Sequence, residues 1–191
     1  MNMQGDVSEE FLENLGEVDG VKLRDIAITA IRSNLSGMVY HPRIDDPVLK
    51  KKAGVFVTLK NRGELRGCIG YIYPTFEIWD ATRRAAVLAA SEDPRFRSVS
   101  KSELDNIEVE ITVLGPLEPM KSKDIQNLKI GKEGLMVVSP VTSGVLLPQV
   151  ATENGFGSLE FLEATCEKAG LSSNAWKDSS VSIYKFSAVV L

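Results

Sequence analysis

The chain has 191 residues, enough for one ordinary domain with a substantial core. Hydrophobic residues make up 43% of it and charged residues 25%, values typical of folded globular proteins rather than of disordered or membrane-embedded ones. The net charge of −4 argues against a broad basic surface for nucleic acid.

The N-terminal residues carry no targeting pattern. They lack the basic and apolar regions of a secretory signal, and no apolar run in the chain approaches the ~18 residues of a membrane span. The only two cysteines, Cys68 and Cys166, do not form a disulfide framework and suit a reducing compartment. We therefore expect a cytoplasmic protein that does not bind membranes.

Residues 1–19 are polar and acidic, and we expect a tail or a short helix there. The remainder, 20–191, is expected to form a single domain with a subdomain edge near 116–145. The first clear element lies between Asp19 and Gly37, where apolar residues recur at helical spacing.

A β-hairpin is predicted next, with strands at 54–60 and 64–71 joined by a turn that contains Gly63. Alternation places Arg66 and Cys68 on one face of the second strand. The same strand contains two glycines, Gly67 and Gly70, each of which weakens a strand by about 0.5–1 kcal/mol. Such glycines allow close approach of a ligand or a backbone; a bulge or a tight helix contact explains them equally well.

The remaining pattern mixes helices and strands without a regular βαβ repeat. Helices are predicted at 76–91, capped by Thr75, and from Ser158 to Gly170, and strands at 107–113, 134–139, 143–147 and 181–190. Cys166 falls on the apolar face of the second of these helices and is expected in the core. The predicted fold class is α+β, with a mixed or mainly antiparallel sheet flanked by helices.

Four short motifs occur in an order that resembles the AMMECR family. They are Leu65-Arg66-Gly67-Cys68-Ile69-Gly70, Asp93-Pro94-Arg95-Phe96, Leu147-Pro148-Gln149-Val150-Ala151 and Lys168-Ala169-Gly170. The resemblance covers about residues 20 to 185. It implies an α+β protein with a cleft beside the first motif, and a link to Memo-type or radical-SAM proteins, to which some members are fused or genomically linked. It implies no assigned reaction.

Cys68 is the candidate nucleophile of the first motif. A guanidinium ~4 Å away stabilises an exposed thiolate by only about 1 kcal/mol, so Arg66 alone activates it weakly. The single histidine, His41, lies in a proline-containing loop and would have to fold over the hairpin to act as a base. A cysteine that lines a site or packs in the fold remains the alternative.

Two arginines in the motifs are candidates for binding an anionic ligand. Arg66 and Arg95 each belong to one of the motifs, and paired guanidinium forks match a carboxylate or a phosphate. The alternatives are that Arg95 pairs with Asp93 or Glu103 and only supports its turn, and that Arg66 is a buried structural partner of a carboxylate. The chain lacks the spacing of histidines and cysteines that a structural zinc site needs, and it has no phosphate-binding glycine fingerprint, so we expect neither a metal nor a cofactor.

Two classes of function remain open. The first is a protein that binds a small anionic ligand or substrate in a cleft, with or without chemistry at Cys68. The expected ligand-binding residues are Arg66, Gly67, Cys68, Gly70, Asp93 and Arg95. The second is a noncatalytic binding or adaptor module whose partner is a protein.

Overall fold

In a computed structural model, which describes residues 6–191, the chain divides into two compact units, Met1–Gly115 with Val189–Leu191 and Pro116–Ala188. The first five residues of the predicted 1–19 tail lie outside the described residues; within the rest, Glu9–Asn14 forms a short helix, α1, capped by Ser8.

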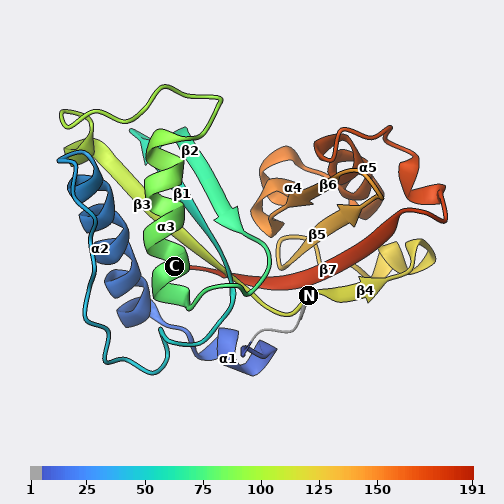
Figure 1. The fold of residues 1–191 in the computed structure, drawn as a ribbon. Helices are drawn as coiled ribbons and strands as arrows, with labels where there is room; N and C mark the ends of the chain where they lie inside the picture. The colour runs from blue at the N-terminus through green and yellow to red at the C-terminus, as the bar shows by residue number, and fades with distance from the viewer. Residues whose placement is uncertain (1–5) are drawn as a thin grey trace. The chain divides into compact units, whose positions relative to one another are not determined.

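Unit 1 is a small antiparallel sheet with two helices on one face. Its elements are α1, α2 (Glu17–Asn34), β1 (Gly54–Asn61), β2 (Glu64–Tyr71), α3 (Ile78–Ser91), the 3-10 turn η1 (Leu104–Asn106) and β3 (Ile107–Leu114). Strand β1 lies between β2 and β3 and pairs antiparallel with both. Helices α2 and α3 lie side by side, and α3 packs along β1 and β2 (Figure 1).

The core of unit 1 follows from the alternation of its strands. Val55, Val57 and Leu59 of β1 are completely buried, and the alanine-rich face of α3 lies against this cluster. Small alanines let the helix approach the sheet closely, and Gly67 of β2 lies against Ala89 in the C-terminal half of α3.

Unit 2 is built from antiparallel strands with helices around them. Its elements are β4 (Glu118–Met120), the 3-10 helix η2 (Ser122–Asn127), β5 (Glu133–Val138), β6 (Ser143–Leu146), α4 (Pro148–Asn154), α5 (Ser158–Lys168), the 3-10 turn η3 (Ala175–Lys177) and most of β7 (Ser182–Val190). Strand β7 pairs with β4 and β5, and β6 pairs with β5. Cys166 is fully buried here beside Phe161 and Leu162, which confirms its core placement.

The predicted α+β class with a mainly antiparallel sheet is confirmed, but the predicted start and cap of the helix at 76–91 were wrong. Helix α2 begins at Glu17, before Asp19, because the Asp19 carboxylate accepts the Gly16 N–H in a capping box. Helix α3 begins at Ile78 and Thr75 does not cap it, because the backbone of Glu77 is held extended by a β-bridge to Lys52. Helix α4 and strand β4 were not predicted.

Candidate functional site

The two glycines of the β2 motif lie against protein atoms of unit 1. A Cβ added at Gly67 would sit 2.2 Å from the carbonyl oxygen of Ala89 in α3, and one added at Gly70 would sit 2.4 Å from Cγ of Phe56 in β1. Real Cβ atoms do not approach so closely. The tight helix contact predicted as an alternative for Gly67 is therefore present. The predicted bulge is present as well, because the pairing of β1 with β2 shifts between Leu59 and Lys60 and skips Arg66.

Cys68 lies on the sheet face opposite to Gly67, across from Thr58 in the ladder. The Thr58 hydroxyl donates a hydrogen bond of 3.3 Å to the Cys68 Sγ. Burial raises the pKa of the Cys68 thiol, and the nearby Asp93 and Glu110 carboxylates raise this pKa further, while Thr58 and the charge of Arg95 oppose the rise. Cys68 is therefore a neutral thiol at neutral pH, the reverse of an activated nucleophile.

Asp93 connects the edge of β2 to the turn after α3. Its buried carboxylate accepts the backbone N–H of Cys68 at 2.9 Å and that of Arg95 at 3.1 Å. It also pairs in bidentate fashion with the Arg95 side chain, at 3.0 Å to Nε and 2.7 Å to Nη2. The Arg95 guanidinium, joined by these backbone donors, holds the pKa of Asp93 well below its usual range. An ionised Asp93 thus satisfies an edge amide that would otherwise face outward.

Arg95 matches the structural alternative predicted for it in one respect, since it pairs with Asp93. Its side chain nevertheless remains 46% exposed, and its guanidinium carbon lies 5.3 Å from the centroid of the Phe96 ring. The bidentate pair uses Nε and Nη2, so Nη1 of Arg95 takes no part in it.

Arg66 leaves the sheet and reaches the segment after α3. Its Nε donates to Glu103 at 3.0 Å and its Nη2 donates to the Ser98 carbonyl at 3.3 Å, with a side chain only 12% exposed. Hydrogen bonds from Arg66 and from Ser100 lower the pKa of Glu103 to about 2. The third nitrogen, Nη1 of Arg66, is buried and has no hydrogen-bond partner among the described residues.

The fold therefore brings together most of the predicted residues in one region of unit 1. Cys68 and Arg95 are both joined to Asp93, and the guanidinium carbons of Arg66 and Arg95 lie 6.0 and 5.3 Å from the centroid of the same Phe96 ring. His41 is exposed in the loop after α2, and no interaction within residues 6–191 links it to Cys68.

Sequence reasoning missed two members of this region. Thr58 could have been found by counting across the hairpin, because it stands directly opposite Cys68. Glu103 was considered only as a partner for Arg95, and its true partner is Arg66, 37 residues away.

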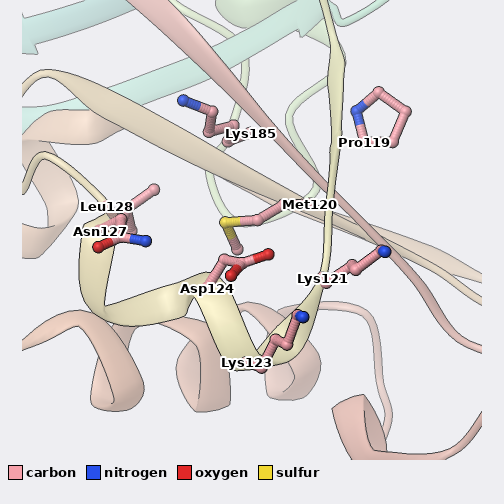
Figure 2. Close-up of a pocket in the computed structure, with 8 residues that line it drawn as sticks. All are labelled: Pro119, Met120, Lys121, Lys123, Asp124, Asn127, Leu128 and Lys185. Atoms are coloured by element: carbon pink, nitrogen blue, oxygen red, sulfur yellow. The ribbon is translucent and has the colours of Figure 1, made fainter.

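A pocket of about 410 Å³ in unit 2 is lined by three lysines, Lys121, Lys123 and Lys185. Figure 2 shows that their amino groups point in different directions instead of converging. Lys185 is already paired with the buried Glu133 at 2.7 Å. The three lysines therefore do not form a single positively charged site for an anion.

Residues 6–191 contain neither a candidate metal cluster nor a helix suited to span a membrane. No group of three or more histidine, cysteine, aspartate or glutamate side chains is placed to hold a metal ion in that part of the chain. None of its helices has the length and apolar character that a membrane span requires.

Comparisons with known proteins place these features in a wider group. The sequence model described as AMMECR1 matches residues 24–191. A protein of Methanothermobacter thermautotrophicus is 42% identical over 182 residues, which cover 92% of this chain and 95% of the relative. Protein PH0010 of Pyrococcus horikoshii is 41% identical over 157 residues, 78% of this chain and 77% of the relative.

The crystal structure of the uncharacterized protein PH0010 matches this fold with a TM-score of 0.85 and 38% sequence identity. The match covers 96% of this chain and 92% of that one.

Proposed function

The chain belongs to the AMMECR1 family, and from this premise we propose that it binds a small carboxylate- or phosphate-bearing ligand beside the motif strand β2, without covalent chemistry in its resting state. In the proposed site Arg66, Cys68 and Arg95 face the ligand, and Gly67, Gly70 and Asp93 hold these residues in position. We also propose that it acts in the cytoplasm.

One observation carries the proposal: Nη1 of Arg66 is buried and has no hydrogen-bond partner among the described residues. Buried charged donors rarely remain unpaired, because the cost of their desolvation is then not recovered. An anionic ligand supplies the missing acceptor.

Arg95 provides a second hydrogen-bond donor beside the same Phe96 ring. Its Nη1 stands outside the Asp93 pair, and its side chain is half-exposed against Phe96. The guanidinium is held in position by Asp93, so it loses little side-chain entropy on binding.

Cys68 is assigned to the lining of the site. Its pKa is raised by burial, so its thiol is protonated at neutral pH and offers a weak S–H donor. For Cys68 to act as a nucleophile, a ligand or partner would first have to lower this pKa. The enzymatic alternative therefore requires such a ligand or partner.

The first test is native mass spectrometry of the purified wild-type protein, which should retain a small anion. The second is calorimetric titration of that anion, or of inorganic phosphate as a general probe. Arg95→Gln is the decisive variant because Arg95 is half-exposed, and urea denaturation of the variant checks that the fold survives the loss of the ion pair with the buried Asp93. We expect binding to weaken by tenfold or more, the effect of about 1.5–3 kcal/mol for a charge-assisted hydrogen bond.

Arg97→Gln is the matched control, since Arg97 is an exposed arginine of the same turn. Equal affinities in wild type, Arg95→Gln and Arg97→Gln would refute the proposed site, as would a wild-type protein that retains no anion and binds no phosphate. Arg66→Lys serves as the second variant, because it keeps the charge beside Glu103 but lacks the planar fork.

A further inference from the structure

One groove in unit 1 is lined by residues outside the four motifs. It has a volume of about 260 Å³ and runs between α2, the segment that follows it, and α3. Its walls are largely apolar, with Ala30 from α2, Met38 and Val39 from the following segment, and Val87 and Leu88 from α3. Met38 and Val39 are 62% and 68% exposed, which is unusual for two adjacent large apolar side chains.

Arg84 on the same groove is held in a fixed orientation. Its Nε donates to Asp80 at 2.8 Å, and its guanidinium carbon lies 4.6 Å from the centroid of the Phe76 ring. Phe76 in turn packs edge-on against Tyr71, which also lines the groove, with ring centroids 5.0 Å apart. The position of the guanidinium plane is thus set before any ligand arrives.

The two terminal nitrogens of Arg84 have no hydrogen-bond partner within residues 6–191, and the side chain is 44% exposed. Asp80 does not neutralise them alone, because its other oxygen accepts two hydrogen bonds from Arg83, at 3.0 and 2.6 Å. One carboxylate therefore serves two guanidinium groups, which leaves a net charge of +1 beside an apolar groove.

We propose that this groove binds a linear monocarboxylate with an alkyl chain of medium length. The carboxylate would take the two free nitrogens of Arg84 as a planar fork, and the chain would lie on Met38, Val39 and Leu88. The groove is smaller than the roughly 300–1,000 Å³ of sites for drug-sized ligands, which favours one slender chain over a ring system.

The probe is octanoate, titrated by calorimetry into the full-length protein. Octanol is the control compound without a charge, and acetate is the control compound without a long alkyl chain. We expect saturable binding of octanoate and affinities at least tenfold weaker for both comparison compounds. In a protein labelled with ¹³C at its methionine methyl groups, the Met38 signal should shift with octanoate, and Met38→Ile identifies that signal.

Arg84→Gln should weaken octanoate binding about tenfold or more, and Arg84→Lys should recover part of it. Arg62→Gln, at an exposed arginine of the hairpin turn, is the matched control and should leave the affinity unchanged. Equal binding of octanoate and octanol, or unchanged affinity in Arg84→Gln, would overturn the proposal. So would the absence of any binding up to about 10 mM octanoate, where even a millimolar site would be occupied.

Discussion

Substitution of Gly67 by alanine tests whether the motif glycine serves the packing of α3. The added Cβ would lie 2.2 Å from the Ala89 carbonyl oxygen and 3.1 Å from its carbonyl carbon. The obstacle is helix backbone, so a side-chain rotation cannot relieve the overlap; either α3 or β2 must move. Because Ala85 and Ala89 are buried against the sheet, that movement opens gaps along the contact.

Overpacking of a filled core typically costs about 1–3 kcal/mol. A strand alanine recovers about 0.5–1 kcal/mol relative to glycine through the lower entropy of the unfolded chain. We expect a cost at the upper end of the overpacking range, because the atoms that the new Cβ would meet belong to the backbone of Ala89. The net expectation is therefore a loss of about 2 kcal/mol from the free energy of unfolding of unit 1.

Urea denaturation followed by tryptophan fluorescence measures this loss directly. Trp79 lies in unit 1 and Trp176 in unit 2, so Trp176→Phe leaves a reporter for unit 1 alone. Gly16→Ala is the control, because an added Cβ there meets no atom within 4 Å and only the N-cap of α2 is affected. A loss below about 0.5 kcal/mol in Gly67→Ala, with ligand binding abolished, would mean that Gly67 serves ligand approach instead.

Four further predictions follow from individual contacts. Cys68 should alkylate with iodoacetamide more slowly than free cysteine at pH 7, because burial raises its pKa; peptide mass spectrometry measures the rate, and a faster rate would contradict the neutral thiol. Because Arg66 and Ser100 lower the pKa of Glu103 from 4.5 to about 2, its contribution to stability is present above pH 4.5 and is lost as the pH falls toward 2. Glu103→Gln should therefore lose less stability than wild type over that interval in acid denaturation, and an unchanged slope would show that the carboxylate is not coupled to folding. Cys166→Ala should cost unit 2 about 1–2 kcal/mol in urea denaturation monitored by Trp176, since Cys166 is fully buried; no loss would argue against that packing. Prolonged chelation should leave the melting temperature unchanged, whereas a fall of about ten degrees would reveal a structural metal.

Local sequence patterns are enough to place most of the helices and strands. The hairpin strands, β3 and the start of α5 were predicted almost to the residue, because alternation and helical spacing act between residues a few positions apart. The family resemblance was likewise available from short motifs and is confirmed by the match over residues 24–191.

Tertiary structure alone decided which residues the motif contacts. The sequence placed Arg66 beside Cys68 on one strand face, yet Arg66 pairs with Glu103 and it is Arg95 whose charge acts on Cys68. It left a tight helix contact and a bulge open for Gly67; the Ala89 carbonyl provides the contact, and the register shift that skips Arg66 provides the bulge. These partners lie 22 to 37 residues away in the chain, and an ion pair or a steric contact depends on distance in space, which no local periodicity encodes.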